Sequence, residues 1–219
     1  MKAQRVDVST ALVSAVAGQV LLVGTVWLLP FASAHRVTDD TIGELVLGPY
    51  GFLLTLAFAV AALGLVTLAI AIRKAIPLTA GARAGSGLLA TAGVALLIGG
   101  LFDTDRLDGA IDWDSLSANG VVHLLAVAVS FICAVAAMVV LTWTFARSAR
   151  WRPFTPWSGL LATGSVSLLL AQGGQQDSST GLLQRLLVTL VAAWVVAVAW
   201  RVRSSATDAH EARSTVARP

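Results

Sequence analysis

The stretch that decides the fold is YGFLLTLAFAVAALGLVTLAIAIRK, residues Tyr50–Lys74. It carries no charged residue before Arg73, and its apolar part is long enough to cross the hydrocarbon core of a bilayer, which takes about 20 helical residues. It ends at Arg73 and Lys74, and such basic residues are typical of the cytoplasmic end of a membrane helix. The stretch therefore predicts a membrane-spanning helix over residues 50–72.

Five further apolar runs extend this prediction to a polytopic membrane protein. They cover residues 10–30, 85–102, 120–145, 157–171 and 181–200. The 219 residues are 57% hydrophobic and only 12% charged, whereas soluble domains carry about 25% charged residues. The run 157–171 reaches a spanning length only if Gln172 and the glycines after it continue the helix. We expect an all-α bundle of six transmembrane helices within residues 10–203.

The basic residues are distributed unevenly over the two sides of these spans. Twelve of the 15 lie in the N-terminus, in the loops after the second and fourth spans, and in the C-terminal tail. The positive-inside rule predicts that this side is the cytoplasm, with both termini cytoplasmic and the protein in the cell membrane. The segment 1–9 is then a cytoplasmic N-terminus, and the polar tail 204–219 is expected to be disordered. Because the arginines lie in short clusters at span ends, we expect no nucleic-acid partner.

The sequence also bears on two other possibilities, a cleaved signal peptide and a disulfide. MKAQR, the first apolar run and the ASA of residues 32–34 resemble a signal peptide with its cleavage site. The apolar run exceeds the roughly 7–15 residues of a signal sequence, which favours an uncleaved helix. Cys133 is the single cysteine, so an intramolecular disulfide is excluded.

Small residues predict which helix faces point into the bundle, because membrane helices associate through close backbone approach. We expect one inward ridge on the third helix and another on the fifth, each at four-residue spacing, and a third inward face on the fourth helix. The ridge of the third helix consists of Gly87, Thr91, Ala95 and Gly99, followed by Asp103. The ridge of the fifth helix consists of Gly159, Thr163, Ser167 and Ala171, and the inward face of the fourth consists of His123, Ser130, Ala134 and Ala137.

A cluster of ionisable residues lies between the third and fourth spans, in IGGLFDTDRLDGAIDWDSLSANGVVHLLAVAVSF, residues 98–131. Five aspartates are followed by His123, which is the only histidine within a span. Antiparallel neighbours would bring His123 and the aspartates to one depth. We expect a polar pocket open to the extracytoplasmic side and lined by Glu44, Asp103, Asp105, His123 and Arg185. The alternative is a network of ion pairs and hydrogen bonds, between Arg185 or Arg106 and the aspartates and between His123 and Asp103, that only ties helix ends together.

The sequence offers little support for a metal, a cofactor or a catalytic motif. There is no H-x-x-x-H or C-x-x-C pair for zinc, no second histidine within a span for haem, and no G-x-S-x-G motif. His123 with carboxylates is a weak pattern for Ca²⁺ or Mg²⁺. We expect no metal and no cofactor.

Residues Thr41–Lys74 and the end of the third span resemble the Domain of Unknown Function 998 family of six-span bacterial membrane proteins. Its typical block reads serine-glutamate-leucine, then glycine-x-tyrosine-glycine, then an apolar helix. The matching residues are Glu44, Leu45, Gly48, Tyr50 and Gly51, with Gly43 in place of the usual serine. The family's second signature is a phenylalanine-proline-threonine-aspartate run followed by a histidine. It is matched by Phe102, Thr104, Asp105 and His123, with Asp103 in place of proline.

This resemblance covers about residues 10–205 and implies six spans and a site containing Glu44, Tyr50, Asp105 and His123. It implies no activity, because the family has none established. The six-span pattern also resembles, more distantly, the Frag1/DRAM/Sfk1 group of membrane proteins linked to lipid handling.

Two classes of function follow from the sequence. The first is a non-enzymatic membrane protein that has membrane lipids as partners and binds a lipid headgroup, another small ligand, an ion or a protein at its outer face. The second is a membrane-embedded hydrolase or lipid-modifying enzyme that uses His123 with Asp105 or Asp103 as acid and base. The missing nucleophile and metal motifs favour the first class. The sequence does not indicate an oligomeric state.

Overall fold

The computed structural model describes the backbone of residues 8–33, 35–106, 113–174 and 179–216, and the side chains of 10–33, 35–106, 113–172 and 179–204. The expectations for Ala34, Asp108, Asp112, Asp177 and the segment 1–7 lie outside the described residues. Six long helices and two short 3-10 helices, with no strand, make up the secondary structure of the described part. They are α1 (Val8–Ala32), η1 (Gly43–Leu47), α2 (Gly51–Ala75), α3 (Ala80–Leu101), α4 (Ala118–Ala146), η2 (Arg152–Phe154), α5 (Thr155–Gly174) and α6 (Thr180–Val216).

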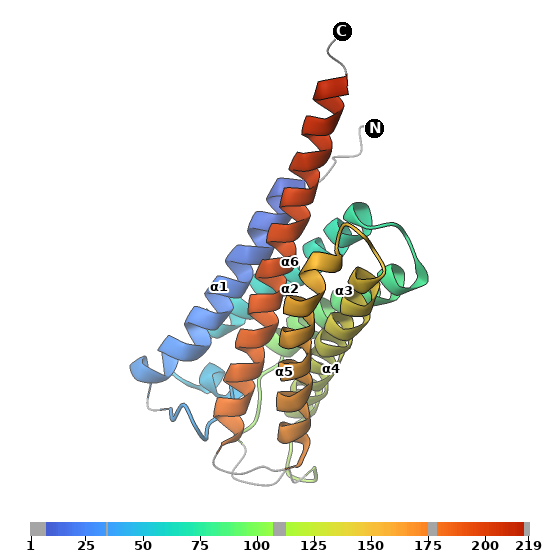
Figure 1. Ribbon diagram of the computed structural model, residues 1–219. Helices are drawn as coiled ribbons and strands as arrows, with labels where there is room; N and C mark the ends of the chain where they lie inside the picture. The colour runs from blue at the N-terminus through green and yellow to red at the C-terminus, as the bar shows by residue number, and fades with distance from the viewer. Residues whose placement is uncertain (1–7, 34, 107–112, 175–178, 217–219) are drawn as a thin grey trace.

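The prediction of an all-α protein with six membrane spans is confirmed, since all six long helices are long and apolar enough to cross a bilayer. The fifth helix begins at Thr155 and continues to Gly174, so its 20 residues reach about 30 Å at 1.5 Å per residue. The last helix, α6, has 37 residues and extends past the ends of its neighbours (Figure 1). It continues to Val216, through most of the tail for which the sequence predicted disorder.

The six helices form a closed ring in chain order. Each helix packs against the next one, and α6 packs against α1 as well as α5, which closes the ring. The beginning of α1 and the C-terminal part of α6 therefore lie at the same end of the bundle (Figure 1). Across the ring, α6 also touches α2 and, more sparsely, α4.

The pair α1 and α2 shows how glycine allows this packing. A Cβ atom on Gly18 would lie 2.6 Å from the main-chain oxygen of Val60, and one on Gly64 would lie 2.9 Å from the Cα of Ala15. Neither position leaves room for a side chain, because the two backbones touch. Close approach of this kind replaces the hydrophobic driving force that is absent between helices in lipid.

The inward face is predicted correctly for α4, only in part for α3, and wrongly for α5. On α4, His123, Ser130, Ala134 and Ala137 are all buried. On α3, Ala95 and Gly99 are buried while Gly87, Thr91 and Asp103 are exposed, and Gly85 and Leu89 lie inside instead. On α5, Ser158, Ala162 and Ser165 are buried, whereas Gly159 is half-buried and Thr163, Ser167 and Ala171 are exposed. A four-residue row advances about 40° per step around a helix of 3.6 residues per turn, so a long row leaves the inner face.

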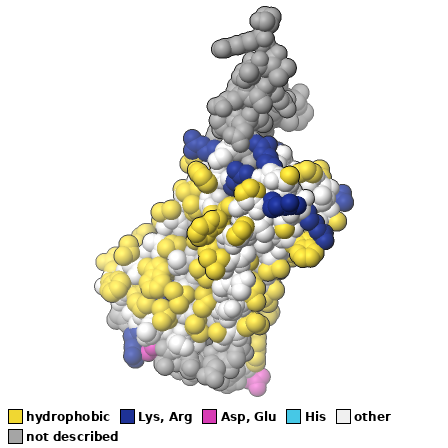
Figure 2. Space-filling view, in the orientation of Figure 1, with side chains coloured by type: hydrophobic (Ala, Val, Ile, Leu, Met, Phe, Trp, Pro, Cys, Tyr) yellow, Lys and Arg dark blue, Asp and Glu magenta, His cyan; other side chains and the backbone are white. Residues whose placement is uncertain are grey.

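The described charged side chains separate to the two ends of the ring. One end, here called the arginine-rich end, holds most of the lysine and arginine side chains, which form a belt near the projecting part of α6 (Figure 2). Its members are Arg73, Lys74, Arg83, Arg147, Arg150, Arg152, Arg201 and Arg203. The other end, here called the acidic end, contains Asp39, Asp40, Glu44, Asp103, Asp105 and Asp114 together with Arg36, Arg106 and Arg185.

Candidate functional site

His123 is the residue around which the site at the acidic end is built. It lies in the second turn of α4, whose first turn is capped by Ser117, because the Ser117 hydroxyl accepts a hydrogen bond from the Gly120 amide at 3.0 Å. The side chain is only 5% exposed. Its Nδ1 lies 2.8 Å from the main-chain oxygen of Gly99 and 3.0 Å from that of Phe102. Gly99 lies in the last turn of α3 and Phe102 is its C-cap, and carbonyl groups at a helix C-terminus have no helical partner.

These two contacts determine the protonation of the ring. A carbonyl oxygen can only accept, so Nδ1 carries the proton and donates to both oxygens. In a neutral imidazole the other nitrogen, Nε2, is then an acceptor. No described residue bonds to Nε2, and a Cβ atom on Gly43 would lie 2.7 Å from it. A side chain at position 43 would therefore collide with Nε2.

Asp105 and Asp103, the expected partners of His123, lie elsewhere at the same end. The Oδ2 of Asp105 accepts a hydrogen bond from the Ser117 amide at 2.8 Å, and its carboxylate lies against Gly120. It therefore caps the N-terminus of α4, where the helix dipole favours a negative charge. Asp103 is exposed. The predicted direct pairing of His123 with either aspartate is wrong, because main-chain oxygens of α3 take the place of a carboxylate.

Glu44 is buried, and it forms hydrogen bonds with a residue of its own loop. Its Oε2 accepts hydrogen bonds from the Thr41 amide at 2.7 Å and from the Thr41 hydroxyl at 3.1 Å, at the start of η1. Tyr50, immediately before α2, is 46% exposed. Glu44 therefore shapes the loop that reaches His123, and Tyr50 does not contribute to the interior.

Arg185 is fully buried in the first turns of α6. Its Nε donates to the main-chain oxygen of Val26 at 3.0 Å, and its Nη1 donates to those of Val37 and Asp40 at 2.9 and 2.8 Å. The carboxylates of Asp40 and Glu44 lie close enough to interact with its charge. Arg185 thus joins α1, the first loop of the acidic end and α6 through main-chain oxygens.

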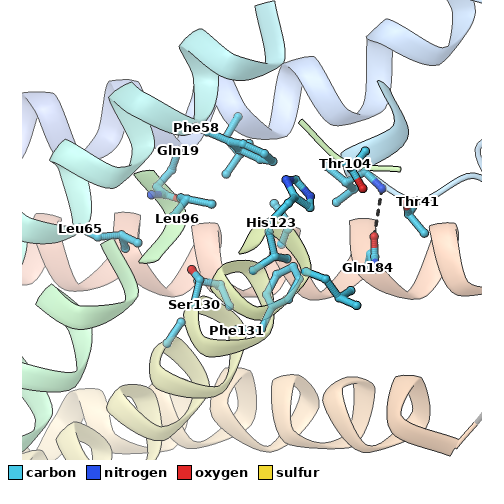
Figure 3. Close-up of a pocket in the computed structure, with 18 residues that line it drawn as sticks. Gln19, Thr41, Phe58, Leu65, Leu96, Thr104, His123, Ser130, Phe131 and Gln184 are labelled. Carbon is cyan, nitrogen blue, oxygen red and sulfur yellow. Dashed lines mark hydrogen bonds between the residues drawn. The ribbon is translucent and has the colours of Figure 1, made fainter. Parts of the chain in front are cut away.

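A pocket of about 90 Å³ lies beside His123, enclosed by α1, α2, α3, α4, α6 and the loop before η1. Its polar lining consists of six side chains, and every other lining residue is apolar or glycine. The six are Gln19, Thr41, Thr104, His123, Ser130 and Gln184. Figure 3 shows His123 between Gln19 on one side and Thr41, Thr104 and Gln184 on the other. Of the six site residues expected from the sequence, only His123 lines this pocket.

The polar residues that the sequence did not assign to the site are uncharged. Gln184 accepts a hydrogen bond from the Ile42 amide at 3.0 Å and holds the loop over the pocket. Gln19 is only 2% exposed, and its Nε2 has no hydrogen-bond partner. An amide within an otherwise apolar span is the signal that could have identified Gln19, since such groups are costly in a membrane.

The pocket brings no metal-binding set together. Among the side chains that the structure describes, no three histidine, cysteine, aspartate or glutamate residues are close enough to hold an ion. The imidazole of His123 is also surrounded by main-chain oxygens and apolar groups, and not by carboxylates. The arrangement is suited to a hydrogen bond with an uncharged group.

The chain was compared with known proteins. The family model described as "Protein of unknown function (DUF998)" matches residues 15–201. No curated protein and no solved structure gives a significant match. The matched range includes α2, α3, α4 and α5 completely and most of the apolar parts of α1 and α6, so it contains the whole pocket lining. The chain therefore belongs to the DUF998 family of membrane proteins of unknown function.

Proposed function

We propose that this membrane protein binds a small amphipathic molecule in the pocket beside His123. The observation that carries the proposal is the pair of polar groups that the pocket lining presents without a hydrogen-bond partner among the described residues, the Nε2 of His123 and the Nε2 of Gln19. The amide nitrogen of Gln19 is buried, and leaving such a group unsatisfied costs about 1–3 kcal/mol. A ligand that forms hydrogen bonds with both groups removes this cost.

The rest of the pocket supports a ligand that is apolar for most of its length. Phe58, Leu65, Leu96, Phe131 and Val191 form much of the wall beyond His123. Apolar walls with a few convergent polar groups are typical of small-molecule sites. An ion is less well supported, because no carboxylate belongs to the lining.

The proposal puts the polar end of the pocket on the extracytoplasmic side of the cell membrane. The support is the separation of charge, because the arginine-rich end matches the cytoplasmic side under the positive-inside rule. Both termini are then cytoplasmic. Membrane lipids, which surround the protein and are themselves amphipathic, are the ligands and partners within closest reach.

Binding is better supported than catalysis. An acid–base histidine needs a proton to transfer and a nucleophile or water to activate. The hydroxyl groups of Thr104 and Ser130 donate to the main-chain oxygens of Asp105 and Ala92. His123 itself is oriented by carbonyl oxygens that cannot exchange a proton with it.

The test is co-purification of ligand with matched histidine variants. His123→Asn keeps an N–H group at the position of Nδ1 and removes Nε2. His35→Asn is the control, because His35 is a half-buried histidine outside the pocket. Mass spectrometry of extracts from protein in mild detergent should find a compound that is depleted in His123→Asn and retained in His35→Asn. Equal amounts in wild type and both variants would contradict the proposal.

A further inference from the structure

We propose that the ligand is an uncharged single-chain lipid with a hydroxyl group at its end and a second oxygen atom a few atoms along the chain, as in a glycerol monoester. This inference rests on the proposed function and adds the chemical class of the ligand. Three properties of the pocket lead to it, and they are the fixed tautomer of His123, the absence of charge in the lining, and the unpartnered amide of Gln19.

The tautomer of His123 selects a donor. Because Nδ1 holds the proton between the oxygens of Gly99 and Phe102, Nε2 can only accept. A hydroxyl group donates to such a nitrogen. A carboxylate or an ionised phosphate has no proton to donate and would face the lone pair of Nε2 with its own negative charge.

The lining selects an uncharged ligand. None of the 18 lining residues is aspartate, glutamate, lysine or arginine. Arg185 donates from Nε and Nη1 to main-chain oxygens, its Nη2 has no partner among the described residues, and it does not line the pocket. Asp105 accepts from the Ser117 amide and does not line the pocket either. Burial of a charge without a partner is strongly unfavourable, so neither an anionic nor a cationic headgroup fits.

Gln19 supplies a second polar contact. Its side chain lines the pocket, is 2% exposed, and has an Nε2 without a hydrogen-bond partner. It lies on the side of His123 away from Thr41 and Gln184 (Figure 3). An oxygen atom of the ligand, such as an ester carbonyl, would accept a hydrogen bond from this amide and satisfy it.

The size of the pocket limits the ligand to one chain. Its volume of about 90 Å³ is close to that of roughly three water molecules and below the 150 Å³ of a cavity known to hold benzene. It encloses the polar end and the first few chain atoms of a single unbranched molecule. Two chains or a fused ring system exceed this space.

The experiment measures binding of three probes that share a ten-carbon chain, namely decanol, decanoic acid and the decanoyl monoester of glycerol. Each is tested with the full chain in phosphatidylcholine nanodiscs, and retention by empty nanodiscs is subtracted. We expect the monoester to bind most tightly and decanol to bind roughly five-fold more weakly, which corresponds to one hydrogen bond. We expect no specific binding of ionised decanoic acid.

Two variants assign the contacts. Gln19→Leu should lower the affinity for the monoester to that for decanol and leave decanol unchanged. Gly43→Ala, which introduces a Cβ atom in front of Nε2 and removes no hydrogen-bonding side chain, should weaken both neutral probes.

The outcomes separate this inference from the proposed function. Decanoic acid binding as tightly as decanol, or an equal loss of both neutral probes in Gln19→Leu, would overturn the ligand class and leave a ligand pocket in place. If no probe binds specifically and no compound co-purifies, the pocket holds only water, and both proposals are overturned.

Discussion

The imidazole of His123 in α4 closes the C-terminal end of α3 by donating from Nδ1 to the main-chain oxygen of Gly99, 2.8 Å away. One side chain therefore satisfies carbonyl groups that a helix end leaves open, and it does so inside the protein where water is scarce. The same contact turns Nε2 toward the pocket. The proposed function thus assigns stability to one nitrogen of the ring and binding to the other, and substitutions can separate the two.

The first prediction concerns the stability of His123 variants. His123→Leu should lower the free energy of unfolding by about 1–3 kcal/mol, because it leaves the oxygens of Gly99 and Phe102 without a donor. His123→Asn should lie closer to wild type, because its amide can donate from the position of Nδ1. Thermal unfolding in detergent gives the comparison. Equal stability of the leucine variant and wild type would show that the contact with Gly99 does not matter.

The second prediction concerns Arg185, which connects α1, the first loop of the acidic end and α6. Arg185→Met should destabilise the protein by about 3 kcal/mol or more, since it removes charge-assisted hydrogen bonds to the buried oxygens of Val26, Val37 and Asp40. Arg36→Met is the control. Arg36 is exposed and pairs with Asp39 at 2.9 Å, and such surface pairs contribute about 0–1 kcal/mol. A similar change in unfolding midpoint for both variants would refute the structural role of Arg185.

The third prediction uses two glycines of one helix. Gly99→Leu should destabilise the protein by about 1–3 kcal/mol, because a Cβ atom there lies 2.9 Å from Cγ2 of Val127. Gly87→Leu should cost much less, because Gly87 is exposed and a Cβ atom meets nothing within 4 Å. The exposed Leu97→Ala serves as a further reference. Thermal unfolding gives the comparison. If Gly87→Leu is as unstable as Gly99→Leu or less stable, the assignment of Gly99 to the inner face of α3 is wrong.

The fourth prediction is the orientation in the membrane. In a Cys133→Ala background, a cysteine at Asp114 should react with an impermeant maleimide added to intact cells, and one at Ser148 should react only after permeabilisation. Asp114 belongs to the acidic end, and Ser148 follows α4, between Arg147 and Arg150 of the arginine-rich end. The reverse labelling pattern would mean that the arginine-rich end faces outward.

The number of spans could be predicted from the sequence because it depends on the length of each apolar run and on the charged residues that flank it. Apolar length and the positions of Arg73, Lys74 and the other basic residues are local facts. The predicted ends lie within about five residues of the helix ends, except for the C-terminal end of α6, which continues to Val216. The inner face of α4 was predictable for a related reason, since His123, Ser130 and Ala134 follow the true helical period. The ridge through Gly87 and Thr91 failed because a four-residue row drifts around the helix.

The site was harder to predict because the hydrogen-bond partners of its side chains depend on the tertiary structure. The sequence directed attention to charged residues, and His123 was assigned a carboxylate because antiparallel third and fourth helices would bring Asp103 and Asp105 to the same depth. A main-chain oxygen carries no sequence signal, so the bonds to Gly99 and Phe102 could not be read in advance. Gln19 and Gln184 are distant in sequence and uncharged, and only the closed ring of helices brings them to one pocket.

The most direct test of the account is the tautomer of His123 in the purified protein. Selective ¹⁵N labelling of histidine, with His123→Asn to assign its signals, distinguishes a protonated ring nitrogen from an unprotonated one by NMR. We expect the proton on Nδ1 and a bare Nε2, whose signal shifts when the decanoyl monoester of glycerol is added. A ring with its proton on Nε2 would contradict the account, because no acceptor would then face the pocket.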